Sequence, residues 1–511
     1  MDNGPSHGPQ RLAAVAVETA GVRAVSAGAL GDEAKESGRY GPASVHVRCS
    51  YLSMAAERAA APVGRVAVDA DQIFNGDTPV YRHGTDAEIR KATNRSGDRI
   101  EPSGLDDWLP VLALLRILPV EVQPIAERAE LAGVSFQTEF MNSGIASEGI
   151  LFHALARSLG IGYQARLRPR DLLMRQKHCL QALKRRGGVR IAAALGENGE
   201  TFVLIAPDRL NIPAMRRFIR QRPHIARRLR LISPRALRDA VKVRAQEVLL
   251  DRAVNGLFEA APALSARIVV TGWQGAVLGA LAVALPVTLA IWPEPAVLGL
   301  HVILSLFFLA CVGLRLAAGL AVRGSTPTAA LRAVQPSEMP VYTVLVALYR
   351  EAEIVPDLLL GLGRLVWPRS KLEIKLVCES DDKETLAAIR AQQLRPYIEV
   401  IEVPPGGPRT KPKALSYALP MTNGDFVVLY DAEDKPHPFQ LIEAWQRFRE
   451  SDEGLACLQA PLSISNRSGS WISAMFGFEY SALFRGLLPW LASMRLVLPL
   501  GGTSNHFRGL M

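Results

Sequence analysis

The chain has 511 residues, a formal net charge of +10 and a mean hydropathy of +0.13. This length allows two or three domains, and a chain that is both basic and apolar on average is typical of a membrane protein with a cationic cytoplasmic side. It carries no zinc-finger, basic-zipper or RNA-platform signature, which argues against a nucleic-acid partner. The five cysteines are odd in number and widely scattered, and Cys378 and Cys457 lie in apolar runs, as expected for buried thiols in a reducing compartment.

Residues 1–105 are rich in small and charged residues and contain few aromatic ones. Such a composition cannot bury enough apolar surface to offset the entropy of ordering, so the sequence predicts a low-complexity, disordered stretch. No compact apolar core follows a basic start, and we therefore expect no signal peptide.

Residues 106–260 have the pattern of a small, mainly helical domain. One of its predicted helices starts at Ser147 and ends at Gly160, because serine favours the first position of a helix and glycine the last. Two strand-like runs follow at 189–194 and 201–206, and an Asn-Gly pair between them predicts a hairpin.

Three short segments of this domain stand out: Ala146-Ser147-Glu148, His153-Ala154-Leu155-Ala156 and Leu159-Gly160-Ile161. Through them the domain resembles the amino-terminal domain of type II secretion ATPases, which also precedes some glycosyltransferases. Some members of that family bind cyclic di-GMP through an Arg-Leu-Gly-type motif. The corresponding Leu115-Arg116-Ile117 lacks the glycine, which argues against cyclic di-GMP binding and favours a regulatory or docking module.

The segment 216–244 is strongly basic. Its cationic residues include Arg216, Arg217, Arg227, Arg228, Arg230, Arg235, Arg238 and Lys242. A juxtamembrane basic residue contributes about 1 kcal/mol to the binding of anionic lipids, so membrane lipids are one predicted partner. A solvated helix surface is the alternative.

Two apolar runs, residues 271–292 and 296–320, are each long enough to cross a bilayer core of about 30 Å. Basic residues lie before the first run and after the second, whereas the turn between them has none. This asymmetry predicts a multi-pass protein of the bacterial inner membrane whose amino- and carboxy-terminal domains are both cytoplasmic. A buried helical hairpin of a soluble protein is the alternative.

Residues 341–511 alternate between strands and helices, which predicts an α/β fold with a mostly parallel sheet. The expected strands are Tyr342–Leu348, Ile374–Cys378, Ile398–Val403, Phe426–Tyr430 and Leu455–Gln459. No glycine-rich dinucleotide motif or P-loop is present.

Polar residues follow these strands, and the carboxyl ends of parallel strands share one edge of a sheet. The candidates are Tyr349, Glu351, Asp381, Asp382, Lys411, Lys413, Asp431, Glu433 and Asp434. Carboxylates suit a divalent ion or a nucleobase edge, lysines suit a diphosphate, and an aromatic ring suits a stacked base. Together they predict a site for a nucleoside diphosphate, although acidic turns and loop lysines are often merely solvated.

At this point the chain resembles glycosyltransferase family 2, of the membrane-bound, cellulose-synthase-like type. Tyr349 and Glu351 match its Tyr-Asn-Glu segment, Asp381-Asp382 its base-binding pair, and Lys411-Pro412-Lys413 its diphosphate segment. Asp431-Ala432-Glu433 matches the metal-binding Asp-x-Asp motif, with glutamate replacing the second aspartate.

The resemblance implies a GT-A (Rossmann-like) fold, a UDP-sugar donor and Mg2+ or Mn2+. By it, Asp431, Glu433 and Asp434 would serve the metal. The implied acceptor-binding residues are Gln459 and Pro461, in a Gln-Thr-Pro-like segment, and Gly502, Thr503 and Ser504. Residues 471–500 resemble the interfacial helices of these enzymes, with a core helix as the alternative.

In the family, an acidic general base follows the acceptor segment, and the matching motif would lie beyond Met511. Inverting transfer needs such a base, so we expect a truncated chain that binds the donor but transfers poorly, unless the sequence is a fragment of a longer product that supplies the base. The sequence leaves two hypotheses. One is an inverting glycosyltransferase that extends an exopolysaccharide. The other is a non-catalytic membrane scaffold that binds a nucleotide sugar or a protein of a polysaccharide-export machinery.

Overall fold

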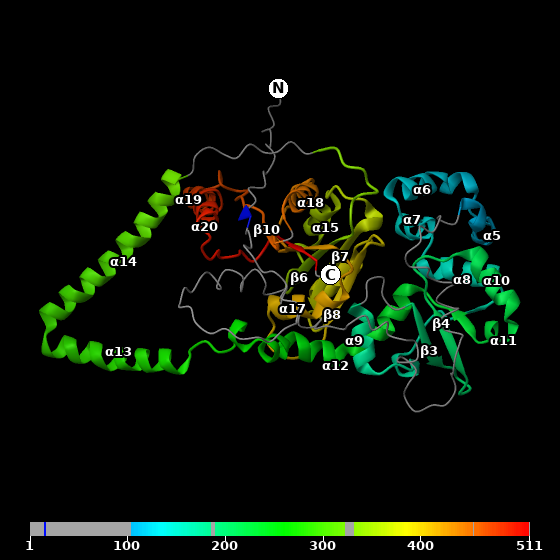
Figure 1. Ribbon diagram of the computed structural model, residues 1–511, viewed down its shortest axis with the longest axis horizontal. Coiled ribbons are helices and arrows are strands. Elements are labelled where there is room, and N and C mark those ends of the chain that lie inside the picture. The colour runs from blue at the N-terminus through cyan, green and yellow to red at the C-terminus, as the bar shows by residue number, and fades with distance from the viewer. Residues whose placement is uncertain (1–14, 17–103, 185–189, 322–331, 453, 510–511) are drawn as a thin grey trace, which may run out of the picture. The chain divides into compact units, whose positions relative to one another are not determined.

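The computed structural model describes residues 15–16, 104–184, 190–321, 332–452 and 454–509 (Figure 1). The stretch predicted to be disordered, residues 1–105, lies almost entirely outside these residues. By their contacts the residues group into two units. The first comprises Met1–Arg58, Gly256–Ala330 and Glu443–Phe507, and the second Ala59–Asn255, Leu331–Ile442 and Arg508–Met511.

The second unit begins with an amino-terminal domain of helices and short strands (Figure 1). Its helices are α5 (Leu105–Leu115), α6 (Pro119–Ala132), α7 (Phe136–Ser143), α8 (Glu148–Leu159), η1 (Pro169–Asp171), α9 (Gln176–Lys184), α10 (Ile212–Gln221), α11 (Pro223–Ala226) and α12 (Pro234–Ala260). Its strands are β2 (Gly162–Tyr163), β3 (Ile191–Leu195), β4 (Thr201–Ile205) and β5 (Leu229–Leu231). They form a four-stranded sheet in the order β2-β5-β4-β3, of which the sequence predicted only the antiparallel β3–β4 hairpin.

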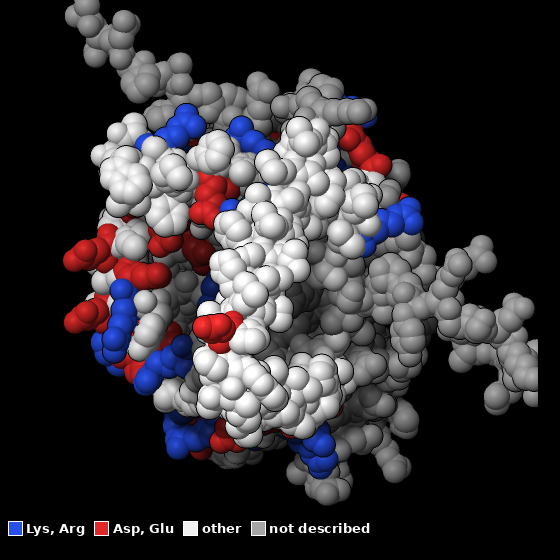
Figure 2. All heavy atoms as spheres, turned by 90° about the vertical axis from the view of Figure 1, so that its left-hand side faces the viewer, with Lys and Arg blue, Asp and Glu red and all other residues white. Residues whose placement is uncertain are grey.

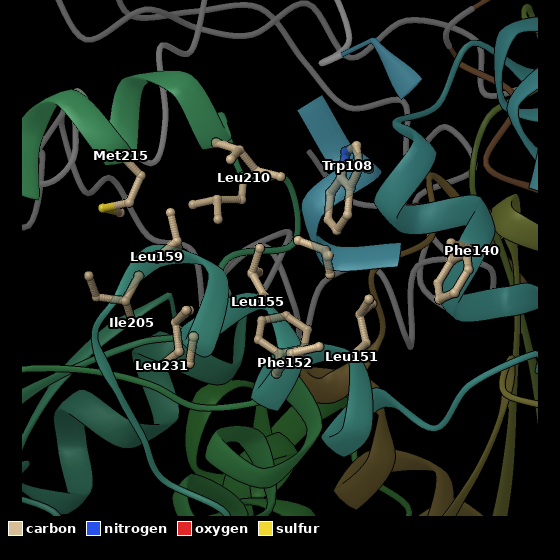
Figure 3. Close-up of a cluster of buried hydrophobic side chains, with 14 of the residues drawn as sticks. Trp108, Phe140, Leu151, Phe152, Leu155, Leu159, Ile205, Leu210, Met215 and Leu231 are labelled. Carbon is tan, nitrogen blue, oxygen red and sulfur yellow. The ribbon is translucent and has the colours of Figure 1, made fainter. Parts of the chain in front are cut away.

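The predicted ends of α8 are confirmed. The hydroxyl of Ser147 accepts a hydrogen bond from the backbone N–H of Ile150, and Gly160 closes the helix with a φ of 70°. One face of α8 supplies Leu151, Phe152, Leu155 and Leu159 to the core of the domain (Figure 3). That core includes side chains from α5, α7, β4 and β5, so the helices and the sheet form one folded body.

The second unit continues with a parallel α/β sheet. Its strands are β6 (Tyr342–Leu348), β7 (Leu372–Glu379), β8 (Ile398–Val403) and β9 (Phe426–Tyr430), and its helices are α15 (Val355–Gly363), η3 (Arg369–Lys371), α16 (Lys383–Ala391), α17 (Lys411–Ala418) and η4 (Leu419–Met421). The order β9-β6-β7-β8 is parallel throughout. Strands β6, β8 and β9 have the predicted bounds. The apolar runs of β6 and β9 are almost entirely buried, as expected for strands covered on both faces, whereas β8, which contains Glu399 and Glu402, is only partly buried.

A buried cluster of charges joins this sheet to α12. The ammonium of Lys375 on β7 has no exposed surface, and it lies 2.7 Å from both Glu373 and Glu399. From α12, Lys242 reaches Glu399 at 2.5 Å and Arg238 reaches it at 3.7 Å. Burial would raise the pKa of Glu399, but these three cations hold it well below its usual value.

This pairing bears on the lipid interpretation of the basic segment. The Arg238 and Lys242 side chains are 25% and 16% exposed and are turned toward Glu399. Lipid contact by the remaining basic residues of segment 216–244 stays a prediction.

The first unit contains the two long apolar helices, α13 (Gly272–Ile291) and α14 (Pro293–Ala321). Both are long and apolar enough to cross a membrane, and their side chains are almost all exposed. Figure 2 faces these helices and shows a broad band of uncharged surface. An exposed apolar surface of this size needs a partner such as lipid.

The first unit also holds short strands and a bent helical segment. Its other elements are β1 (Val15–Ala16), η2 (Pro262–Leu264), α18 (Gln440–Glu450), β10 (Cys457–Gln459), α19 (Trp471–Ala482), a π-helical turn η5 (Leu483–Leu487), α20 (Leu488–Ser493) and β11 (Asn505–Arg508). Strands β1, β10 and β11 pair antiparallel in that order. The aromatic side chains Trp471 and Phe478 of α19 are 77% and 73% exposed, and Glu479 of the same helix lies 3.7 Å from Arg315 of α14.

Candidate functional site

The order of the parallel strands locates the candidate site. The chain proceeds from β6 to β7 to β8 in one direction, then returns to place β9 on the other side of β6. In open α/β sheets, ligands bind beyond the carboxyl ends of the strands at the point where the strand order reverses. That point lies between β6 and β9, and the residues that follow these strands are Tyr349 to Glu351 and Asp431 to Asp434.

The turn after β6 is held by the turn after β7. Arg350 adopts a left-handed conformation, with a φ of 58°, and its backbone N–H donates to the Asp382 carboxylate at 2.6 Å. The backbone N–H of Glu351 donates to the hydroxyl of Thr385 at 3.0 Å. The Tyr349 ring is 38% exposed, and the Arg350 guanidinium lies over it at 5.3 Å.

The two predicted base-binding aspartates have different surroundings. Asp382 begins α16 and accepts a hydrogen bond from the backbone N–H of Thr385 at 3.2 Å. Desolvation works to raise the pKa of Asp382, but the hydrogen bonds from Arg350 and Thr385 outweigh it and lower the pKa. Asp381 is 37% exposed and forms an ion pair with Arg409. Asp382 therefore shapes the turn, and Asp381 is the more accessible carboxylate.

Three carboxylates interact across the reversal point. One oxygen of Glu351, Oε2, is buried and has no hydrogen-bond partner among the described residues. Burial raises the pKa of Glu351, and the charges of Glu433 and Asp431 raise it further, against the opposing effects of a hydrogen bond from the Tyr349 backbone and of the Lys411 charge. Glu351 from one turn thus shares an acidic environment with Asp431 and Glu433 from the other.

The third predicted acidic residue of this turn is engaged in the backbone. The carboxylate of Asp434 accepts a hydrogen bond from the Asp431 backbone N–H at 2.8 Å, and the Asp434 N–H donates to the Asp431 carbonyl at 3.2 Å. Asp434 therefore closes the turn that presents Asp431 and Glu433.

The two predicted diphosphate lysines lie in different places. Lys411 is the first residue of α17, and its ammonium pairs with the Asp431 carboxylate. Lys413 is only 3% exposed, with its ammonium 2.8 Å from Glu379 at the end of β7 and 3.1 Å from the Gly406 carbonyl. Lys411 faces the acidic turn, whereas Lys413 is bound inside the loop that precedes α17.

The residues present fit a divalent ion that binds together with a diphosphate. Within the described part of the chain, no three or more His, Cys, Asp or Glu side chains are grouped to hold a metal by themselves. Mg2+ at nucleotide sites usually takes one or two carboxylates and completes its shell with phosphate oxygens and water. Asp431 and Glu433 supply such carboxylates, and the Lys411 ammonium on Asp431 shows that this carboxylate accepts a cation.

The predicted acceptor residues belong to the first unit and lie close together. The Ala460 backbone N–H, between Gln459 and Pro461, donates to the Ser504 carbonyl at 2.9 Å. Gln459, Thr503 and Ser504 are all buried, and Gln459 Nε2 has no hydrogen-bond partner among the described residues. A Cβ at Gly501, beside Gly502, would lie 2.6 Å from Gln459 Nε2, so the backbone of this segment passes directly against the Gln459 amide.

Comparison with known protein families identifies the carboxy-terminal domain. Residues 340–507 match the family described as glycosyltransferase like family 2. The carboxy-terminal domain is a glycosyltransferase family 2 domain. Its parallel sheet with covering helices is the predicted α/β, GT-A-like fold.

Solved structures of glycosyltransferases are similar to parts of the chain. A mannosyltransferase from Pyrobaculum calidifontis, PcManGT in complex with GDP-Man and Mn2+, is 23% identical over 39% of this chain and 53% of that chain, with a TM-score of 0.29. TarS 1-349 from S. aureus, in complex with UDP-GlcNAc, is 24% identical over 22% of this chain and 31% of that chain, with a TM-score of 0.19. The chain thus spans about half of the mannosyltransferase and a third of TarS 1-349. No curated protein sequence matches it.

Three features of the glycosyltransferase domain were missed in the sequence. They are the pairing of Arg409 with Asp381, the burial of Lys413 against Glu379, and the contact of α12 with the loop before α17. The Asp382-x-x-Thr385 spacing could have indicated a helix cap. The three features named first depend on contacts between distant segments and leave no local signal.

Proposed function

We propose that the chain transfers a sugar from a UDP-sugar donor, with inversion, to a growing exopolysaccharide at the cytoplasmic face of a bacterial inner membrane. One observation carries this proposal. Glu351, Asp431, Glu433 and Lys411 meet where the order of the parallel strands reverses, inside a glycosyltransferase family 2 domain. Carboxylates and a lysine at such a position suit a nucleoside diphosphate.

The proposed donor roles follow from exposure and charge. Tyr349 is partly exposed and offers its ring for the base, and Asp381 is an accessible carboxylate. Asp431 and Glu433 would hold Mg2+ or Mn2+, which neutralises charge on the diphosphate leaving group when it is bound. Lys411 lies at the first turn of α17 and is placed to exchange its partner Asp431 for a phosphate oxygen. Lys413 supports the loop through Glu379.

The proposed acceptor side uses the segments around Gln459, Pro461 and Gly502 to Ser504. Their backbones are hydrogen-bonded to each other, and Gln459 retains a buried amide nitrogen that a hydroxyl-rich acceptor can satisfy. The two apolar helices α13 and α14 and the exposed aromatic residues of α19 support a membrane location. Basic residues precede α13 and follow α14, whereas the turn from Trp292 to Pro295 between the two helices has none. This asymmetry supports a cytoplasmic location of the catalytic domain.

A nucleotide-binding experiment on the full chain, purified in detergent, tests the donor site. We expect UDP to bind in the presence of Mn2+, to bind more tightly than GDP or CMP, and to lose affinity by about 100-fold when the metal is chelated, since the metal bridges the diphosphate. The Asp431→Asn variant should lose Mn2+-dependent binding, whereas Asp357→Asn on the exposed surface of α15 should retain it. An absence of Mn2+-dependent UDP binding by the wild type would refute the donor proposal.

A second measurement separates an enzyme from a scaffold. Membranes that contain the chain are incubated with a panel of UDP-sugars, and the release of UDP is followed. Release that depends on Asp431 supports transfer. Tight binding without release would instead favour a scaffold that holds a nucleotide sugar for a polysaccharide-export machinery.

A further inference from the structure

The loop that precedes α17 is held between two parts of the second unit. It contains Gly406 and Gly407, whose φ angles of 152° and 64° are unfavourable for residues with a side chain. On one side, the Gly406 carbonyl accepts a hydrogen bond from the buried Lys413 ammonium at 3.1 Å. The chain then passes directly to Arg409, which pairs with Asp381, and to Lys411, which pairs with Asp431.

The other side of this loop lies against α12 of the amino-terminal domain. A Cβ built on Gly406 would lie 2.7 Å from Leu250, and one built on Gly407 would lie 2.7 Å from Val254. Real Cβ atoms do not approach so closely, so the helix and the loop backbone are in direct contact. Val254 is β-branched, and such a side chain has one strongly preferred rotamer in a helix, so it cannot turn away easily.

The contacting residues of α12 form two pairs. Arg238 and Lys242 are four residues apart, and so are Leu250 and Val254, so the members of each pair are neighbours on the helix surface. The first two bind Glu399 on β8, and the last two reach the diglycine loop. In Figure 1, α12 runs beneath β8 and α17. The amino-terminal part of α12 is thus bound to the sheet by ion pairs, and its carboxy-terminal part packs against the loop.

We propose that Leu250 and Val254 are positioning residues for the donor site, so that the amino-terminal domain sets donor affinity through α12. This inference rests on the proposed function. Contact from α12 keeps the diglycine loop in the conformation that places Lys411 beside the acidic turn. Displacement of α12, by a partner or by substitution, therefore loosens the loop and weakens donor binding.

The main experiment measures UDP binding, in the presence of Mn2+, by the full chain and by the variants Leu250→Ala and Val254→Ala. We expect the double variant to bind UDP at least tenfold more weakly, because misplacement of a binding group by about 1 Å costs a site up to about 100-fold. Val243→Ala, at an exposed position of the same helix, is the matched control and should leave the affinity unchanged. Leu250→Met and Val254→Ile should restore most of the affinity.

Two further variants separate positioning from general stability. Leu249→Ala removes a buried side chain of α12 that lies about 100° around the helix from Leu250. It should lower the unfolding temperature more than the UDP affinity. Amide hydrogen exchange in residues 404–410 should accelerate in Leu250→Ala and remain unchanged in Leu249→Ala. Equal loss of affinity in all variants, in proportion to their lost stability, would overturn the positioning role.

A double-mutant cycle tests the contact itself. Gly407→Ala places a methyl group against Val254 and should weaken UDP binding, and part of this loss should be recovered when Val254→Ala removes the opposing methyl groups. Strain from the positive φ is the same in both backgrounds and cancels in the cycle. If the wild type binds UDP with Mn2+ but the two changes are additive and Leu250→Ala has no effect, the inference is wrong while the proposed function stands. If the wild type itself fails to bind UDP, the proposed function fails first.

Discussion

The ammonium of Lys411 lies on the carboxylate of Asp431, so the first residue of α17 is paired with the first residue after β9. A lysine therefore occupies the position at which a divalent cation would meet this carboxylate. Binding of a metal and a diphosphate would replace this pair by two new ones. Asp431 would then bind the metal, and Lys411 would bind a phosphate oxygen. On the proposed function, this pair would make metal and nucleotide binding interdependent.

Replacement of this lysine should affect the two ligands in opposite directions. In Lys411→Met, we expect Mn2+ alone to bind more tightly, because the competing ammonium is gone. UDP in saturating Mn2+ should bind about tenfold to 100-fold more weakly, since a hydrogen bond to a charged group contributes about 1.5–3 kcal/mol. Titration calorimetry with each ligand measures both effects, with Lys177→Met on the exposed face of α9 as the control. Weaker binding of both ligands would contradict the exchange.

The carboxylate of Glu351 is partly desolvated. We expect it to lower the stability of the ligand-free protein while it contributes to UDP binding. Its buried Oε2 lacks a partner among the described residues, and Glu433 and Asp431 repel its charge. We therefore expect Glu351→Gln to raise the free energy of unfolding of the ligand-free protein by about 1 kcal/mol and to weaken UDP binding. Thermal unfolding with and without UDP and Mn2+ tests this. Glu353→Gln, at an exposed neighbouring position, should change neither quantity.

The buried cluster around Lys375 predicts a large loss of stability. Lys375→Met leaves Glu373 and Glu399 without the cation that lies 2.7 Å from each, and the removal of one member of a buried pair costs about 3–5 kcal/mol. Arg390→Met breaks the exposed pair with Glu402 and should cost less than about 1 kcal/mol. Urea unfolding of the two variants in detergent compares them. Equal urea midpoints for the two variants would show that water reaches the charges of the cluster in the folded protein.

His506 on β11 predicts a dependence of stability on pH. Full burial lowers the pKa of His506 from 6.5 to about 3. Between these values the unfolded state binds more protons than the folded state, so stability rises with pH up to about 6.5 and then levels off. At pH 5 the loss relative to pH 7 should be about 2 kcal/mol from this residue.

The difference between the wild type and His506→Gln isolates this effect from other titrating groups. The unfolding temperature of the variant should fall less between pH 7 and pH 5 than that of the wild type. His224→Gln, at an exposed position, should retain the wild-type slope. Parallel curves for all three proteins would show that His506 is accessible to protons in the folded state.

The elements that the sequence predicted well are those whose residues carry their own signal. Strands β6 and β9 are apolar runs followed by polar residues, and β8 is rich in Ile and Val and is followed by two prolines. Both ends of α8 are marked, by Ser147 and Gly160. Strands β2 and β5 were not predicted, because two or three residues are too short for any periodicity to develop.

The candidate site also has features that the sequence predicts and features that it does not. The acidic turn after β9 could be found because three carboxylates follow a buried strand. The separate roles of Lys411 and Lys413 could not, because they depend on Glu379 and Asp431, which come from different strands. We interpreted the basic segment as a lipid-binding one because the sequence alone does not reveal that Arg238 and Lys242 pair with Glu399, which lies on a distant strand.

The bond of α12 to Glu399 has a consequence for the dissection of this protein. A shortened version that starts after α12 would leave the Glu399 carboxylate without two of its three cations and would remove the surface against which the diglycine loop rests. Poor yield or weak nucleotide binding by such a fragment would then report the loss of an internal support, and would say little about the chemistry of the catalytic domain.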